Sequence, residues 1–435
     1  MKKAKWVASM LVLASLLVLS ACSGGNGESG ANGSGDTSAG GDGKQGGQDV
    51  KVVSVSNDEG SFVEGLDKVS EALKAYGYSL DVNTYADTTA YQSTLRATLS
   101  SPDSPGMFKW WSGYRMESLV KENLLADLTE AWETYKEKGV NADLANAFTF
   151  DGKVYGLPLA VNYWQVFYNK KVFEANNLQV PTTWDEFLQV AETLKKSGIS
   201  PIAQTADGRW PGFIWFEELM IKYDPDLYVD LLEGRAKYTD ERVVEVMEIW
   251  KSLYDKGYFS EPLNWQNTMA SEFANGNVGM FVMGDWYNGV LMGQGLKPGE
   301  DYGAFILPPI RPEAGNNIIF ETGALLISEH SKDRDNAIEA SKHLFETDVS
   351  GTWTSTIGVA PLVPGVQSDN SVINDIMKEV DEKDYRLLPR YWEGTPTEIC
   401  EYAVDQFVRF MFNPDEYKNV LETIEAKASS YWSSR

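Results

Sequence analysis

The fold class is decided by the stretch VKVVSVSNDEGSFVEGLDKVSEALKAY, residues 50–76. Its first part places valines at positions 50, 52, 53 and 55, a short apolar run typical of a strand. Its second part places apolar residues at helical spacing, namely Phe62, Leu66, Val69, Leu73 and Tyr76. One strand followed by one helix is the repeating unit of an α/β fold.

The same alternation continues on the C-terminal side of this stretch. We expect strands at 80–82, 107–111, 278–283 and 324–328, and helices at 91–99, 119–128, 243–256, 335–347 and 397–412. Thr183 and Glu186 form a capping-box pattern before the apolar stripe of a further helix, and Gly198 follows that helix as a stop signal. Alternating strands and helices predict a parallel sheet with helices on its faces, here in two α/β lobes.

On the N-terminal side, the chain begins with three lysines and then 15 uncharged, mainly apolar residues that end at Leu19-Ser20-Ala21-Cys22. This pattern is typical of a secretory signal, and the run is shorter than the roughly 17 to 25 residues of a membrane span. The tetrad resembles a bacterial lipobox, which implies cleavage after residue 21 and a lipid on Cys22. Residues 23–49 are rich in glycine and serine, a composition that predicts a flexible tether.

Composition argues against several classes of protein. The chain of 435 residues is 43% hydrophobic and 12% aromatic, which is globular. Its net charge of −25 argues against a nucleic-acid partner, and two cysteines with two histidines argue against disulfide scaffolds and zinc sites. The acids at 224, 226 and 230 lack the glycine and terminal glutamate of a calcium loop, so we expect no metal site there and no cofactor; a hard metal bound elsewhere through oxygen stays open. No nucleophile elbow, P-loop or dinucleotide motif is present, so we expect no enzyme.

Tryptophan is in excess, with 14 residues in the chain. Those at 132, 184, 250 and 432 lie in predicted helices and are expected to be packed. Trp110 and Trp111 instead end a predicted strand, where an α/β sheet presents side chains to a crevice. An open aromatic ring beside polar groups suits a sugar, because the ring covers the C–H face while the polar groups bind hydroxyls. A protein interface remains the alternative explanation of exposed rings.

The segment YGLPLAVNYWQVFYNK, residues 155–170, followed by PTTWDEF, residues 181–187, closely resembles carbohydrate-binding solute-binding proteins of bacterial ABC importers. The resemblance continues through FANGNVGM at 273–280, GDW at 284–286 and ETGA at 321–324. It implies two α/β lobes joined by three hinge crossings that close around a sugar, as in maltose-binding-protein-like receptors. It also implies an oligosaccharide ligand, permease subunits as partners, and a monomer held by its lipid anchor on the outer face of a Gram-positive cell membrane.

Placed by this resemblance, the crossings lie near residues 157–162, 320–323 and 360–365. Residues 1–21 are then the lipoprotein signal peptide, and residues 22–49 are the lipidated cysteine with its tether. Lobe one comprises residues 50–160 and 324–362, and lobe two comprises residues 161–322 and 363–435.

The resemblance also implies which side chains line the cleft. Trp286 and Trp392 match stacking rings, and Asn162 stands where maltose-binding relatives carry a glutamate, which argues against a maltodextrin. The other candidates are polar or aromatic residues at element ends, namely Trp110, Trp111, Asp58, Glu59, Phe62, Arg115, Trp210, Phe213, Trp215, Trp265, Asp285, Glu321, Tyr391 and Glu393. Two other functions stay open: a receptor for a peptide or another small solute on the same fold, and a secreted carbohydrate-active enzyme.

Overall fold

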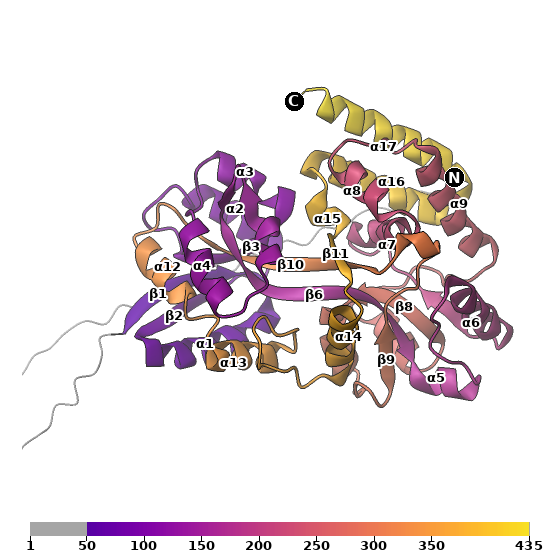
Figure 1. The fold of residues 1–435 in the computed structure, drawn as a ribbon, viewed down its shortest axis with the longest axis horizontal. Coiled ribbons are helices and arrows are strands. Elements are labelled where there is room, and N and C mark those ends of the chain that lie inside the picture. The colour runs from indigo at the N-terminus through magenta and orange to yellow at the C-terminus, as the bar shows by residue number, and fades with distance from the viewer. Residues whose placement is uncertain (1–49, 435) are drawn as a thin grey trace, which may run out of the picture. The chain divides into compact units, whose positions relative to one another are not determined.

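The computed structural model describes residues 50–434, and the predicted signal peptide, Cys22 and the tether lie outside the described residues. Figure 1 shows a mixed α/β body. The strands are β1 (Lys51–Asn57), β2 (Tyr78–Thr84), β3 (Met107–Trp111), β4 (Thr149–Phe150), β5 (Lys153–Val154), β6 (Gly156–Asn169), β7 (Ser200–Ala203), β8 (Val278–Gly284), β9 (Tyr302–Phe305), β10 (Asn317–Ile327) and β11 (Arg386–Pro389).

Helices follow most of the strands. They are α1 (Val63–Leu73), α2 (Thr88–Thr98), α3 (Glu117–Lys121), α4 (Thr129–Glu137), α5 (Lys170–Ala175), α6 (Trp184–Lys196), α7 (Ile214–Tyr223), α8 (Pro225–Leu232), α9 (Glu241–Asp255), α10 (Thr268–Ala274), α11 (Asn288–Gly293), α12 (Arg334–Ser341), α13 (Thr347–Ile357), α14 (Ser371–Glu382), α15 (Tyr391–Gly394), α16 (Thr397–Phe412) and α17 (Tyr417–Trp432). Within residues 50–434, none of these helices combines the length and the apolarity that a membrane span requires.

The main sheet has nine strands and is mixed, which corrects the expectation of a parallel sheet. Strand β1 pairs in parallel with β2 and β3, and β7 pairs in parallel with β8. Between these groups, β10 runs antiparallel to both β3 and β6, and β6 runs antiparallel to β8 and β9. The two long strands β6 and β10 thus connect the two parallel groups, and they lie side by side in Figure 1.

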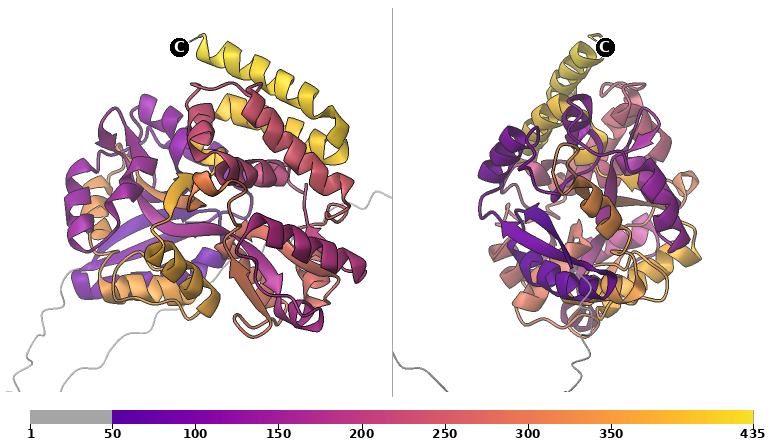
Figure 2. Two further views of the ribbon diagram at one scale, coloured as in Figure 1. Left: turned by 45° about the vertical axis from the view of Figure 1, so that its right-hand side comes forward. Right: turned by 90° about the vertical axis from the view of Figure 1, so that its left-hand side faces the viewer.

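Two large hydrophobic cores lie on either side of this connection. The first core contains residues of β1 and β3, and the second contains residues of β7 and β8. Along β6, Val161 belongs to the first core and Trp164 belongs to the second. Along β10, Ile319 belongs to the second core and Ala324 to the first. Figure 2 shows the helices that cover the sheet on both sides. Both long strands therefore change core within a few residues of Asn162 and Glu321, which are paired in register.

Several local predictions are confirmed. The Thr183 hydroxyl accepts from the Glu186 amide, and the Glu186 carboxylate accepts from the Thr183 amide, which completes the capping box of α6. Strand β3 and helix α16 have the predicted bounds. The tryptophans at 132, 184, 250 and 432 all lie in helices.

Two predicted helices are shorter than expected. The helix expected at 119–128 ends at Lys121, because Asn123 takes a φ of +55° and the Ala126 amide then donates to the Ile327 carbonyl of β10 at 2.9 Å. The helix expected at 335–347 ends at Ser341, and a separate helix begins at Thr347 after Glu346 adopts an extended conformation. In both places a tertiary contact or a turn interrupts an apolar stripe that continues in the sequence.

Candidate functional site

A cluster of four tryptophans lies where β6, β8 and β10 meet. We call Trp164, Trp210, Trp265 and Trp286 the tryptophan cluster. The ring centroids of Trp210 lie 6.2 Å from those of Trp164 and Trp286 and 5.8 Å from that of Trp265, and the rings of Trp265 and Trp286 are 5.6 Å apart. Trp164 is buried, whereas the other three rings are partly exposed. The cluster therefore offers aromatic surface on one side and packs on the second core on the other.

Trp286 is positioned by the turn that follows β8. Gly284 ends the strand, and a Cβ atom there would lie 2.4 Å from the indole nitrogen of Trp286, so only glycine allows this approach. The indole also donates a hydrogen bond to the carboxyl group of Glu321 on β10. Trp286 is thus held by strand β10 as well as by its own turn.

Polar atoms without partners lie next to the tryptophan cluster. The Asp285 side chain is 1% exposed; its Oδ2 accepts from the Tyr163 amide at 3.3 Å, while its Oδ1 has no hydrogen-bond partner. The Asn162 Oδ1 and the Trp164 Nε1 are also buried without partners. Burial raises the pKa of Asp285 well above its usual value, and the nearby Glu321 adds to that rise. Buried polar groups are almost always paired, so these three atoms indicate a place where a polar ligand can bind.

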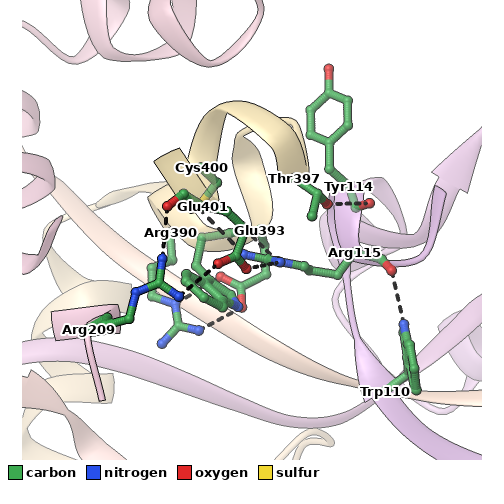
Figure 3. A network of polar contacts seen from close by, with 10 residues as sticks. Trp110, Tyr114, Arg115, Arg209, Arg390, Glu393, Thr397, Cys400 and Glu401 are labelled. Carbon is green, nitrogen blue, oxygen red and sulfur yellow. Dashed lines mark hydrogen bonds and ion pairs between the residues drawn. The ribbon is translucent and has the colours of Figure 1, made fainter. Parts of the chain in front are cut away.

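The second group of charges surrounds Arg390. Its Nε donates to Glu393 Oε2 at 2.9 Å, its Nη2 donates to Glu393 Oε1 at 2.7 Å, and its Nη1 forms an ion pair with Glu321. We call these three residues the Arg390 cluster, part of which is drawn in Figure 3. Burial raises the pKa of Glu321 to about 7, against the opposing effect of the Arg390 charge. The Arg390 guanidinium also lies 5.4 Å from the ring centroid of Trp164, which joins this cluster to the tryptophans.

On the lobe-one side, Lys109 of β3 holds two predicted residues together. Its Nζ donates to Asp58 Oδ1 at 3.1 Å and to Glu59 Oε1 at 2.9 Å. The same ammonium lies 4.4 Å from the ring centroid of Trp111, which is partly exposed. Asp58, Glu59 and Trp111 therefore form one group, and the positive charge of Lys109 lowers the pKa of Glu321 across the site.

Arg115 makes a different contact from the one we expected. Its guanidinium lies 3.8 Å from the ring centroid of Trp392, its Nη1 donates to Glu401 at 2.9 Å, and its Nε donates to the Trp392 carbonyl at 3.3 Å (Figure 3). Protein groups hold the Arg115 guanidinium in this structure, and its contact with a sugar hydroxyl stays a prediction. A sugar that stacked on this face of Trp392 would have to displace Arg115.

Several predicted side chains are buried in the cores. Trp110 is 2% exposed, and its indole donates to the Arg115 carbonyl at 3.0 Å. Phe213 and Trp215 face the core of lobe two, and the hydroxyl of Tyr391 lies 2.6 Å from that of Tyr238. Phe62 packs edge-on against Trp353. Trp110, Phe213, Trp215 and Tyr391 are therefore buried in this structure, whereas Phe62, like Trp111, is partly exposed.

Two residues of the site were missed by the sequence reasoning. Lys109 is the single charge in the apolar strand Met107–Trp111, and that isolation was the available signal. Arg390 directly precedes the predicted residues Tyr391 and Trp392, but its surroundings in the sequence do not mark it as a buried charge. The acids at 224, 226 and 230 pair with Arg242, Arg386 and Arg235, and the described residues contain no group of His, Cys, Asp and Glu side chains that could hold a metal ion.

Comparisons with known proteins agree with this architecture. The multiple sugar-binding protein of Streptococcus mutans is 26% identical over 264 residues, 58% of this chain and 61% of its own. The chain spans between about half and 85% of the length of the curated relatives it matches first. Among solved structures, the solute receptor AcbH, described as exclusive for β-D-galactopyranose, superimposes with a TM-score of 0.76 at 19% identity, covering 88% of this chain and 99% of its own. RafE in complex with raffinose gives 0.70 at 17%, covering 87% and 98%.

Structural likeness at such low identity establishes the fold, which is the two-lobe fold of solute-binding proteins. The family is established by a sequence model. The model of the bacterial extracellular solute-binding proteins matches residues 69–379, which is more than half of the chain. The chain therefore belongs to the family of bacterial extracellular solute-binding proteins.

Proposed function

We propose that this protein is the sugar receptor of an ABC importer and captures an oligosaccharide between its two lobes. The observation that carries the proposal is the tryptophan cluster next to three unpartnered buried polar atoms, on Asn162, Trp164 and Asp285. Stacked rings take the apolar face of a sugar and unpartnered polar atoms take its hydroxyls. The sugar-binding names of RafE, AcbH and the S. mutans relative support the same class of ligand.

The mechanism we propose is lobe closure without a chemical step. The crossings would lie where β6 and β10 change core, near Asn162 and Glu321, and in the segment after Ala360. The lobes would then have the boundaries 50–160 with 324–362 and 161–322 with 363–435. A ligand that contacts both lobes favours the closed state by its differential affinity. Trp111 with Glu59 would contribute the lobe-one contacts, and Trp286 with Trp265 the lobe-two contacts.

The cellular setting is part of the proposal. Cleavage before Cys22 and lipidation of its thiol would hold the receptor on the outer face of a Gram-positive membrane, where it would deliver the sugar to permease subunits. Replacing the thiol by Cys22→Ser would release the protein into the medium, whereas the wild-type chain would stay in the membrane fraction. Equal distribution of the two proteins would contradict the anchor.

The binding site is tested by Trp286→Ala, with Trp184→Ala as the matched control. Trp184 is also partly exposed but stacks on Phe187 at the start of α6, at 5.2 Å between centroids. In calorimetry with a neutral oligosaccharide that binds the wild type, Trp286→Ala should weaken affinity by about tenfold or more, because one stacked ring is lost. Trp184→Ala should bind as the wild type does. Equal affinities of the two variants would refute the assigned site.

Two other functions are outcomes of the same work. A peptide that raises the melting temperature when sugars do not would favour the peptide receptor. An oligosaccharide that is cleaved during incubation, as seen by chromatography, would favour the carbohydrate-active enzyme.

A further inference from the structure

The basic side chains around the candidate site are already paired. Among the residues that the structure describes, those in contact with the site are Lys109, Arg115, Arg209 and Arg390. Lys109 binds the two carboxylates of Asp58 and Glu59, and Arg390 binds the two of Glu321 and Glu393. Arg115 and Arg209 both pair with Glu401 (Figure 3), and Arg209 also pairs with Asp405. The two buried cations, Lys109 and Arg390, each already have two carboxylate partners.

The groups that lack partners carry no positive charge. The Asn162 Oδ1 is an acceptor and the Trp164 Nε1 is an uncharged donor, while the Asp285 carboxyl, whose pKa burial raises well above its usual value, donates when protonated and accepts when ionised. An acceptor calls for a hydroxyl, an amide N–H or an amine on the ligand, whereas a carboxylate, sulfate or phosphate group offers only further acceptors. A buried carboxylate without a counter-charge is strongly unfavourable, and like charges in an interface cost several kcal/mol.

We propose that the site selects glycans by charge: it accepts neutral glycans and those bearing amines, and it rejects glycans bearing carboxylates, such as uronic acids. This selection rests on the proposed sugar-binding function, and it names the substrate class that the site takes. The residues that impose it are the carboxylates that pair with Lys109 and Arg390. Other contacts recognise the positions of the sugar hydroxyls, so the effect of the ligand's charge can be tested separately.

The experiment compares neutral glycans with counterparts that carry one or more carboxylates. Three matched pairs are titrated into the purified protein by calorimetry: xylotriose against xylotriose substituted with glucuronic acid, cellotriose against its trimer oxidised to carboxylates at C6, and galactose against galacturonic acid. For every pair whose neutral member binds, the acidic member should bind at least about tenfold more weakly, which corresponds to about 1.4 kcal/mol. An acidic member that binds as tightly as its neutral partner overturns the proposal.

A charge variant shows that the assigned residues impose the selection. Glu59→Gln leaves Lys109 with one carboxylate instead of two, so the affinity ratio between neutral and acidic glycan should fall at least about threefold. Glu64→Gln is the matched control, because Glu64 lies nearby on α1 in an exposed pair with Lys68 and should leave the ratio unchanged. An unchanged ratio in Glu59→Gln would overturn the assignment to Lys109. If no neutral glycan binds at all, the proposed function fails, and the charge selection fails with it.

Discussion

The Arg390 cluster gives the sharpest prediction about stability. The side chains of Arg390, Glu321 and Glu393 are 10%, 13% and 7% exposed, and Arg390 forms ion pairs with both carboxylates. The substitution Arg390→Met keeps much of the side-chain volume and removes the charge, so two buried carboxylates lose their partner. Breaking a buried ion pair by removing one partner typically costs about 3–5 kcal/mol, because the remaining charge stays buried.

The matched control lies on the same segment of chain. Arg386 begins β11 and pairs with Asp226, and the two side chains are 46% and 82% exposed. An exposed pair contributes about 0–1 kcal/mol, so Arg386→Met should change the free energy of unfolding by no more than that. Urea denaturation followed by tryptophan fluorescence measures both variants under the same conditions.

The reasoning is refuted if Arg390→Met and Arg386→Met lose the same free energy of unfolding. A triple variant that combines Arg390→Met with Glu321→Gln and Glu393→Gln should recover a large part of the loss, since no uncompensated charge remains. If the triple variant is as unstable as the single variant, the loss comes from packing around the Arg390 stem and not from the charges.

Three further predictions concern a cap, a turn and a titration. Thr183→Ala should lower the free energy of unfolding by about 1 kcal/mol because α6 loses its cap, whereas Thr193→Ala in the same helix should change it by less than about 0.5 kcal/mol; urea denaturation separates them. Gly113→Ala should destabilise more than Gly152→Ala: both have positive φ, of 59° and 77°, but only at 113 would the new Cβ meet a backbone oxygen of α15, at 2.2 Å. Because the pKa of Glu321 is raised, the folded state binds more protons than the unfolded state between about pH 4.5 and 7. The free energy of unfolding should therefore fall as the pH rises through this range, and its slope against pH should be smaller in Glu321→Gln.

Local signals in the sequence were sufficient for individual elements. The capping box at Thr183 and the apolar run at Met107–Trp111 each depend on residues within a few positions, and both appear as predicted. The direction of strand pairing was not available in this way. Strand β10 inserts antiparallel between β3 and β6, which are 45 residues apart in sequence, and a pattern of alternating strands and helices carries no information on such an insertion.

The candidate site was predictable where one segment forms it. Gly284, Asp285 and Trp286 are consecutive, and the structure places them beside Asn162 and Glu321 at the connection between the cores. Exposure of single rings was not predictable, because Phe213 packs against Tyr391 and Trp392, which are far apart from it in the sequence. Trp215 is buried in the same way against Phe187 and Phe259. The partners of Lys109 and Arg390 were missed for the same reason, since a charge can be buried only when tertiary contacts bring its counter-charges to it.

The central claim is that this member of the family binds neutral sugars. It is tested most directly by a thermal-shift measurement of the purified protein with xylo-, arabino-, manno-, cello-, galacto- and malto-oligosaccharides, the corresponding monosaccharides, and peptides. A ligand at 100 times its dissociation constant adds about 2.7 kcal/mol to the free energy of unfolding, which raises the melting temperature. The account predicts such a rise with at least one neutral glycan series and none with peptides. A rise with peptides and none with any glycan would contradict it.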